Sequence, residues 1–231
     1  MLEPSHVLVL IPAYNEAEKI NAVVQDVIQK GFPVLVVDDG STDHTSDQLK
    51  NLPAKVIVSP SNQGKGASLR KGFEWFLRQD YAAVVLMDAD GQHDPAELGI
   101  FLLALGENGW DFVIGNRLNN PTNMPLVRVL TNRFMSWVIS GVARQKIADS
   151  QCGYRAIRKA ALQKMVLSTA HFEIESEMLL QASRLGFKIG SVPVRCIYGR
   201  NKSRINPVID TVRFFKFISK SIFPKKVRSS A

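Results

Sequence analysis

Short runs of β-branched and other apolar residues alternate with longer segments of helical period along the first half of the chain. The predicted strands are residues 6–11, 34–37, 55–59, 82–87 and 111–115, with a later strand near 189–196. The predicted helices are residues 16–30, 43–51, 65–79 and 95–105. Strands that alternate with helices in this way indicate an α/β fold with a doubly wound, mostly parallel sheet and helices on both faces.

The regular alternation ends after Arg117. A polar loop rich in Asn and Pro follows at 118–125, then a helix, a loop at 149–155 and further helices. The 231 residues are 45% apolar, which is enough material for the core of one large domain. We therefore predict one domain over residues 1–205, with halves 1–118 and 119–205, and a separate tail over 206–231.

The basic charge of the chain belongs to its C-terminal end. The formal net charge is +8, but residues 195–231 hold ten Lys and Arg side chains against the single Asp210. On a helical wheel over 209–223, Arg213, Lys216 and Lys220 fall within a narrow arc and apolar residues fill the rest. This pattern is typical of an amphipathic helix on an anionic membrane surface. The alternative is a helix packed on the domain with a solvated end.

Other partners and compartments are limited by what the sequence lacks. No apolar run approaches the roughly 20 residues that a membrane-spanning helix needs. No recognised nucleic-acid-binding module accompanies the basic tail, so we expect no nucleic-acid partner. Cys152 and Cys196 lie in unrelated contexts and no signal peptide is recognisable, which predicts a reducing compartment and no disulfide.

Polar segments directly follow four of the predicted strands. These segments are residues 12–16, 38–41, 62–66 and 88–94. In open α/β sheets, ligands bind beyond the carboxyl ends of the strands. Four such segments on one edge predict a ligand site there.

The segment after the fourth strand indicates a metal site. Asp88 and Asp90 are alternate carboxylates that can share a hard cation, Mg²⁺ or Mn²⁺, and such a cation can bridge the phosphates of a nucleotide. Gln92 adds a neutral oxygen ligand. His93 is better suited to packing or to supporting a ligand, because hard cations prefer oxygen. Asp94 before Pro95 also fits a helix N-cap.

The segments after the second and third strands have two interpretations each. Asp38 and Asp39 can accept hydrogen bonds from a base edge or from ribose hydroxyls. The alternative is an Asx-turn or a helix cap that uses Ser41 or Asp43. Lys65 lies between two glycines, but the spacing is not that of a phosphate-binding P-loop, and a lone Lys after a turn is often solvated.

Taken together, these segments resemble the family 2 glycosyltransferases of the GT-A fold, and most closely the dolichyl- and polyprenyl-phosphate sugar synthases. The resemblance covers residues 6 to about 205. It is carried by the motifs Ile11-Pro12-Ala13-Tyr14-Asn15-Glu16, Val37-Asp38-Asp39-Gly40-Ser41, Gly64-Lys65-Gly66, Asp88-Ala89-Asp90-Gly91-Gln92-His93, Gly115-Asn116-Arg117 and Asp149-Ser150-Gln151-Cys152-Gly153-Tyr154-Arg155. Many relatives have Ser at the position of Cys152 and Lys at the position of Arg204.

The resemblance implies a role for each matching position. The residues implied at the nucleotide are Pro12, Ala13, Tyr14, Glu16, Asp38, Asp39, Lys65 and Asp88. The implied metal ligands are Asp88, Asp90 and Gln92. The residues implied at the acceptor or at phosphate are Arg117, Gln151, Arg155, Ser203 and Arg204. Arg133 and Arg200 are further candidates, because cations are needed to bring two anionic groups together. Asp90, Arg117 and Asp149 are the implied catalytic residues.

The implied reaction moves a sugar, with inversion, from a UDP- or GDP-sugar to a polyprenyl-phosphate-type lipid at the inner face of the cytoplasmic membrane. A phosphate acceptor needs no strong base, because its second pKa is near ~6. A hydroxyl acceptor would need a positioned carboxylate, Asp149 or Glu175.

Three other functions compete with this interpretation. The first is a family 2 transferase with a hydroxyl acceptor, and the second is a silent nucleotide-sugar-binding subunit recruited to a membrane. The third, a nucleotidyltransferase, usually begins with a glycine-rich phosphate loop, and residues 12–16 contain no glycine. A processive polysaccharide synthase is disfavoured because the string Gln181-Ala182-Ser183-Arg184-Leu185 lacks the expected Trp.

Overall fold

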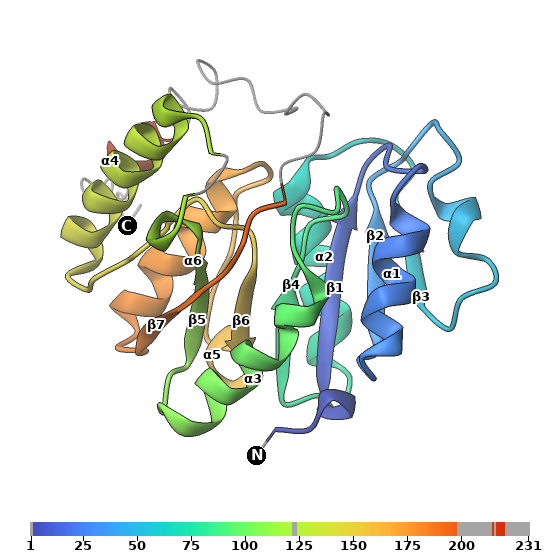
Figure 1. Cartoon of the computed structure of the whole chain (residues 1–231), viewed down its shortest axis with the longest axis horizontal. Coiled ribbons are helices and arrows are strands. Elements are labelled where there is room, and N and C mark those ends of the chain that lie inside the picture. Colours follow the sequence, from blue (N-terminus) through green and yellow to red (C-terminus); the bar gives the residue numbers. More distant parts are fainter. Residues whose placement is uncertain (1, 122–123, 198–213, 215, 220–231) are drawn as a thin grey trace, which may run out of the picture. The chain divides into compact units, whose positions relative to one another are not determined.

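A computed structural model describes residues 2–121, 124–197, 214 and 216–219 (Figure 1). The chain divides into two units, Met1–Gly199 and Arg200–Ala231, and the sheet with its covering helices belongs to the first. The predicted boundary at residue 205 and most of the predicted tail helix lie outside the described residues. Of that helix, the described positions 214 and 216–219 are helical.

One sheet of seven strands runs through the first unit, counted over its described residues, in the order β3-β2-β1-β4-β6-β5-β7. The strands are β1 Val7–Ala13, β2 Val34–Asp38, β3 Lys55–Val58, β4 Ala83–Leu86, β5 Phe112–Asn116, β6 Arg155–Arg158 and β7 Ile189–Pro193. β1 pairs in parallel with β2 and β4, β2 with β3, and β5 with β7. The predicted mostly parallel sheet is therefore confirmed.

β6 is the antiparallel exception, and the sequence did not predict it. It lies between β4 and β5 and is antiparallel to both. Its four residues include Arg155 and Arg158 at the ends, so neither length nor apolar content marks it as a strand. The tertiary setting supplies what the sequence lacks, because both edges of β6 are paired and its first three residues are buried.

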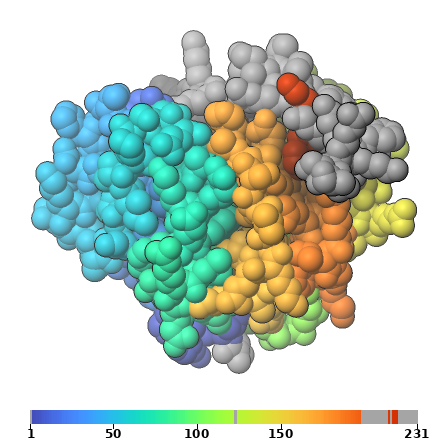
Figure 2. All heavy atoms as spheres, turned by 180° about the vertical axis from the view of Figure 1, so that it is seen from behind, coloured from blue at the N-terminus to red at the C-terminus, as the bar shows by residue number. Residues whose placement is uncertain are grey.

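Helices cover both faces of the sheet, as predicted. The α-helices are α1 Ile20–Gln29, α2 Lys65–Leu77, α3 Leu98–Glu107, α4 Leu126–Ala143, α5 Lys159–Leu162 and α6 Glu173–Arg184. The 3₁₀ turns are η1 Pro4–His6, η2 Ser46–Leu49, η3 Pro95–Glu97 and η4 Arg117–Asn119. α1 and α3 lie on one face, whereas α2 packs on β1 and β2 from the other face and contacts α6. Seen from behind, α2 in teal lies beside the orange segment that includes α6 (Figure 2). α4 packs on α6 (Figure 1).

Two predicted helices are shorter than expected because local side-chain bonds hold their first residues in loops. The predicted helix 16–30 begins at Ile20, and the predicted helix 43–51 is reduced to η2. The carboxylate of Asp43 accepts hydrogen bonds from the N–H groups of Ala17 and Thr45. These bonds compete with helix formation at both places. Asp94 does cap the turn at Pro95, by accepting from the N–H of Ala96.

The core lies between the sheet and its two helical layers. The central strands β1, β2 and β4 are buried along almost their whole length, as strands covered on both faces should be. Phe76 from α2 and Phe101 from α3 are fully buried in the two layers. Cys152 is buried and Cys196 is partly exposed, and the described structure contains no disulfide between them. Within the described ranges, none of the helices has the length and apolar character needed to cross a membrane.

Candidate active site

The loops after β1 and β2 lie side by side at the carboxyl edge of the sheet. Ala13 pairs with Asp38 in the parallel ladder, and the N–H of Asp39 donates to the carbonyl of Ala13 at 2.8 Å. Asn15 has a φ of +52°, and its N–H donates to Oγ of Ser41 at 2.8 Å. The structure therefore brings together the predicted nucleotide residues from 12–16 and 38–39.

Asp38 and Asp39 are buried and hold these loops through backbone N–H groups. Oδ1 of Asp38 accepts from the N–H of Ser41, three residues later, at 2.8 Å, so this carboxylate does make a local turn bond, although not the two-residue bond of an Asx-turn. The carboxylate of Asp39 accepts from the N–H groups of Gln63 and Gly64, the latter at 2.7 Å. Asp39 thus fixes the loop that leads into α2. A direct contact of either carboxylate with a nucleotide stays a prediction.

Lys65, the first residue of α2, links three segments of the site. Its Nζ lies 2.6 Å from Oδ1 of Asp88, after β4, and 2.7 Å from Oε1 of Glu175, in α6. Burial alone would lower the pKa of Lys65, but the two carboxylates outweigh it and raise that pKa above its ordinary value. The solvated alternative for this lysine is therefore wrong.

Asp88 stays ionised in this setting. Burial alone would raise its pKa, but the Lys65 ammonium lowers the pKa of Asp88 to about 2, and Arg117 acts in the same direction. The N–H of Asp88 donates to Nδ1 of His93 at 3.1 Å. Burial lowers the pKa of His93, which agrees with a neutral ring that accepts at Nδ1. His93 also stacks on Tyr154 at 4.8 Å between ring centroids, so its predicted packing role is confirmed.

Gly153 lets the loop at 149–155 pass directly over this cluster. A Cβ atom at Gly153 would lie 2.6 Å from Oδ2 of Asp88 and 3.1 Å from Nζ of Lys65. Any side chain here would displace one of the two charged groups. The glycine is thus required by the close approach of the loop to the site.

Asp90 and Gln92 offer the oxygen ligands that Mg²⁺ or Mn²⁺ prefers, but they do not form a complete cage. One carboxylate oxygen of Asp90 accepts from the N–H of Gln92 at 3.0 Å, and the carbonyl of Asp90 accepts from Nζ of Lys19. The part of the chain that the structure describes contains no cluster of three His, Cys, Asp or Glu side chains suited to a metal ion. Because Asp88 is paired with Lys65, the protein supplies few ligands by itself. This suits Mg²⁺, which is commonly held by one or two carboxylates together with substrate phosphates.

Arg117 and Asp149 form a buried, two-pronged ion pair. Nε of Arg117 lies 2.9 Å from Oδ2 of Asp149, and Nη2 lies 3.1 Å from Oδ1. The backbone N–H of Arg117 and that of Gln151 also donate to this carboxylate. Asp149 is fully buried. Arg117 and Asp149, two of the three predicted catalytic residues, therefore bind each other. The pair joins the end of β5 to the loop at 149–155.

Arg155 lies in the interior, away from where a phosphate could reach it. Its side chain is fully buried, and it donates to the carbonyls of Cys152, Ser150 and Glu175. These bonds shape the loop at 149–155, so we no longer assign the acceptor phosphate to Arg155. The neighbouring thiol of Cys152 is also enclosed, and burial raises its pKa to about 12. Gln151 remains partly exposed.

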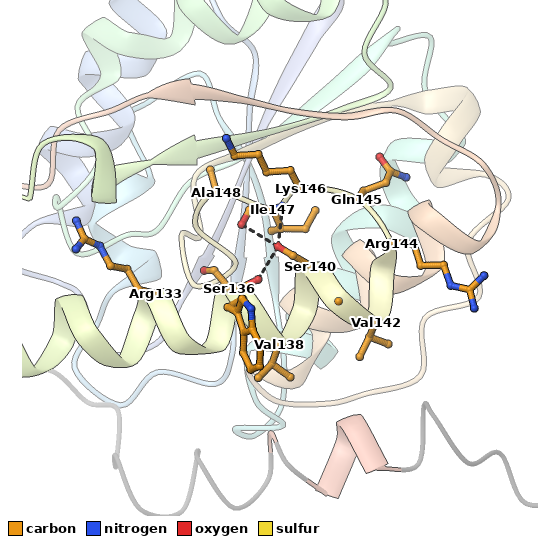
Figure 3. Close-up of a pocket in the computed structure, with 12 residues that line it drawn as sticks. Arg133, Ser136, Val138, Ser140, Val142, Arg144, Gln145, Lys146, Ile147 and Ala148 are labelled. Atoms are coloured by element: carbon orange, nitrogen blue, oxygen red, sulfur yellow. Dashed lines mark hydrogen bonds between the residues drawn. The ribbon is translucent and has the colours of Figure 1, made fainter.

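Arg133 is exposed on α4, beside a groove that runs along this helix and the segment after it (Figure 3). Arg144 and Lys146 line the same groove. The predicted acceptor residues Arg200, Ser203 and Arg204 lie outside the described residues.

Sequence reasoning missed Glu177 and the ion pairs of Glu175. The carboxylate of Glu177 accepts from the N–H and hydroxyl groups of both Ser168 and Thr169. The N–H of Ala67 donates to the carbonyl of Ala170, so this loop reaches the start of α2. The signal was the string Phe172-Glu173-Ile174-Glu175-Ser176-Glu177, which carries three carboxylates in the first turns of a helix that is otherwise mostly buried.

Comparison with known proteins identifies the family of this chain. The family model for "Glycosyl transferase family 2" matches residues 8–166. The UDP-N-acetylglucosamine–dolichyl-phosphate N-acetylglucosaminyltransferase of Methanococcus voltae is 32% identical over 219 residues, covering 83% of this chain and 86% of that protein. The polyprenol monophosphomannose synthase of Mycolicibacterium smegmatis is 35% identical over 202 residues, covering 81% and 76%.

A solved structure supports the fold. Glucosyl-3-phosphoglycerate synthase from Mycobacterium tuberculosis, in complex with Mn²⁺, UDP and phosphoglyceric acid, matches with a TM-score of 0.68 and 19% identity, over 94% of this chain and 77% of that one. The expected GT-A fold is thereby confirmed. Since the family model spans most of the chain and both sequence relatives match over most of their length, the chain belongs to glycosyl transferase family 2.

Proposed function

We propose that this protein moves a sugar from a nucleoside-diphosphate sugar to the phosphate of a polyprenyl- or dolichyl-type lipid. Two relatives similar over most of the chain are named for transfer to such lipid phosphates. The observation that carries the proposal is the pairing of both candidate bases. Asp149 is held by Arg117, and Glu175 by Lys65 and Arg155. The oxygens of both candidate bases are therefore already engaged within the protein, whereas a phosphate acceptor is largely a dianion near neutral pH and needs no protein base.

The donor site in this proposal is the edge formed by β1, β2 and β4. Pro12, Ala13, Tyr14 and Glu16 line the base side, with Asp38 and Asp39 behind them. Lys65 and Asp88 lie where the diphosphate would be bound. Asp90 and Gln92, with Asp88, would hold Mg²⁺ or Mn²⁺, and the cation would neutralise charge on the departing diphosphate.

The acceptor site in this proposal lies on the opposite side of the reacting sugar, which gives inversion. Arg117, Gln151 and Arg133 supply positive charge and hydrogen bonds for the lipid phosphate. From the sequence alone, we propose that Arg200, Ser203 and Arg204 also bind phosphate. The contribution of these residues is to bring two anionic groups together and to hold them in line. A lipid acceptor also places the protein at a membrane, and we propose the inner face of the cytoplasmic membrane with the basic tail as one contact.

A transfer assay with paired acceptors tests the proposal. Purified protein is incubated with UDP- or GDP-sugars, Mg²⁺ or Mn²⁺, and either a polyprenyl phosphate or the matching polyprenol. We expect product only with the phosphate, and loss of product when the metal is chelated. Equal transfer to the polyprenol would favour a hydroxyl acceptor and contradict the proposal.

A thermal-shift panel identifies the donor independently of the acceptor. A nucleotide sugar that binds the folded protein raises its melting temperature by mass action. One base should stabilise more than the other, and the shift should grow with Mn²⁺. The absence of any shift across the panel would count against a nucleotide-sugar site.

A further inference from the structure

One face of α4 is unusually apolar for an exposed surface. Leu126, Val127, Leu130 and Trp137 are each 57–77% exposed, and Phe134 is half exposed. At 3.6 residues per turn these five side chains fall within an arc of about 100°. The rings of Phe134 and Trp137 lie 6.1 Å apart and are nearly parallel. The exposed large apolar residues elsewhere in the described chain are scattered over separate elements, which is ordinary for a protein surface.

The packing of the domain does not require this face to be apolar. α4 contributes its other side to the core, through Val129, Met135, Ser136, Ile139 and Ala143. On the same wheel these buried positions lie opposite the exposed arc. An amphipathic surface helix would carry polar residues on its outer side. A contiguous exposed apolar patch of this kind marks an interaction surface.

The charges around α4 select the kind of partner. From Arg117 to Ala148 the sequence holds Arg117, Arg128, Arg133, Arg144 and Lys146, and not one Asp or Glu. Arg133 falls at the edge of the apolar arc, and Arg144 follows the helix directly. Large apolar and aromatic side chains in a segment whose charged residues are all basic are the pattern of a helix that lies in the interface of an anionic bilayer.

The position of α4 relative to the site fits a lipid partner. On its buried side, Oγ of Ser136 accepts from the N–H of Ser150 at 2.9 Å. Ser150 is the neighbour of Asp149, which pairs with Arg117. The exposed apolar face therefore lies on one side of α4, and the loop that carries Asp149 contacts the other side.

We propose that the exposed apolar face of α4, made by Leu126, Val127, Leu130, Phe134 and Trp137, docks the domain on an anionic membrane. The apolar side chains enter the boundary between headgroups and acyl chains, and the bordering arginines contact lipid phosphates. This goes beyond the proposed function, because it assigns a lipid-binding surface inside the catalytic domain in addition to the basic tail. It rests on that function only for the identity of the lipid that the docked protein meets.

Vesicle binding tests the docking face. The full chain is mixed with vesicles of phosphatidylcholine containing phosphatidylglycerol, and the bound fraction is measured by flotation. The double variant Leu130→Gln/Trp137→Gln should bind about tenfold more weakly or worse, which corresponds to about 1.4 kcal/mol. The matched control is Leu103→Gln/Val166→Gln, which changes two exposed apolar residues elsewhere and should bind like the wild type. Equal binding of the two double variants would overturn the proposal.

Fluorescence identifies what contacts Trp137. Brominated acyl chains should quench the wild type on vesicles, and should quench the Trp137→Phe variant much less. Without vesicles, iodide should quench Trp137 readily. Protection from iodide in a monomer would mean that another part of this chain covers the face, and protection in a dimer would mean that a second copy does. Either result would overturn membrane docking.

The outcome is separable from the proposed function. With a short, water-soluble prenyl phosphate as acceptor, both double variants should turn over like the wild type, since no membrane is involved. If the wild type binds vesicles through α4 but transfers no sugar to any lipid phosphate, the docking face stands and the proposed function fails. If transfer to the soluble acceptor succeeds while the α4 variant still binds vesicles normally, the proposed function stands and the docking face fails.

Discussion

The proposed sugar-donor side and acceptor side of the active site differ in the groups that hold their carboxylates. On the donor side, Asp38, Asp39 and Asp90 accept from backbone N–H groups, which are neutral. On the acceptor side, Asp149 and Glu175 are matched by the cations of Arg117, Lys65 and Arg155. Asp88 sits at the junction, where it shares Lys65 with Glu175.

This difference determines what each side can bind. Among the described residues, no cation forms an ion pair with Asp38, Asp39 or Asp90, so the donor side favours an added cation and, with it, a diphosphate. On the acceptor side, Arg117 contacts both oxygens of Asp149, and Lys65 and Arg155 lie against Glu175, so the oxygens of both buried carboxylates already have partners within the protein. Glu177 is an exception in this half, because it accepts only from N–H and hydroxyl groups, and its role is to shape the loop at 166–171.

The largest expected effect comes from removing Asp90, a donor-side carboxylate that forms no ion pair among the described residues. Asp90→Ala should lower the transfer rate by about 10³-fold or more, because the developing charge on the leaving diphosphate loses its metal. The protein should remain folded, since the Asp90 side chain is partly exposed. Steady-state transfer rates and circular dichroism check both points. Asp80→Ala, an exposed carboxylate elsewhere, is the control, and near-normal turnover of Asp90→Ala would rule out the metal assignment.

On the acceptor side the first effect of breaking a pair should be on stability. Arg117→Ala leaves the fully buried Asp149 without its cation, which should lower the free energy of unfolding by about 3 kcal/mol. The double variant Arg117→Ala/Asp149→Ala should recover part of this loss, because no unpaired charge is left. Urea unfolding measures both, and Arg78→Ala, at an exposed arginine, should change little. If the double variant loses as much stability as Arg117→Ala and Asp149→Ala together, the two residues are not coupled as the structure indicates.

The sequence predicted the donor side better than the acceptor side, for a physical reason. Donor-side residues follow parallel strands that are consecutive in the chain, so strand order alone brings residues 12–16 and 38–39 together. The acceptor side depends on β6, an antiparallel strand of four residues that lacks an apolar run. Its ion pairs join distant segments, as from Lys65 to Glu175, and no periodicity encodes such pairs.

The misassignment of Arg155 has the same origin. A motif places an arginine in a loop of the site but does not say which way it points. Here its guanidinium turns inward and satisfies three carbonyls. The α4 helix shows the opposite situation. Its apolar composition is typical of a buried helix, and only the packing of its neighbours shows that one apolar face is exposed.

A smaller effect is expected at Asp39, because its removal leaves neutral N–H groups without an acceptor but leaves no charged partner in the described structure unpaired. Asp39→Ala leaves the N–H groups of Gln63 and Gly64 without their acceptor, which should lower the free energy of unfolding by about 2 kcal/mol. Asp39→Asn, which keeps one acceptor oxygen, should lose less. Hydrogen exchange at the two amides should be faster in the alanine variant, while Asp26→Ala, on the exposed side of α1, should leave it unchanged. Unchanged exchange in Asp39→Ala would show that this carboxylate does not hold the loop.

The smallest effect should appear at Asp88, where the free energy of unfolding should depend on pH. The pKa of Asp88 is about 2 in the folded protein, against about 3.9 for an unperturbed Asp, because Lys65 favours the anion against the opposing effect of burial. The folded state therefore binds the proton less readily than the unfolded state, and the ionised group stabilises the fold above pH ~4. This contribution is lost as the pH falls through about 2. Since the side chain is 31% exposed, we expect about 1 kcal/mol after allowing for solvent screening. Urea unfolding of the wild type and of Asp88→Asn, compared from neutral pH down to the lowest pH at which both fold, should show a stability difference that shrinks on acidification. The same comparison with Asp80→Asn should give a stability difference that does not change with pH. A constant difference for Asp88→Asn as well would mean that Lys65 stabilises only the Glu175 carboxylate, and Lys65 would then belong to the acceptor side alone.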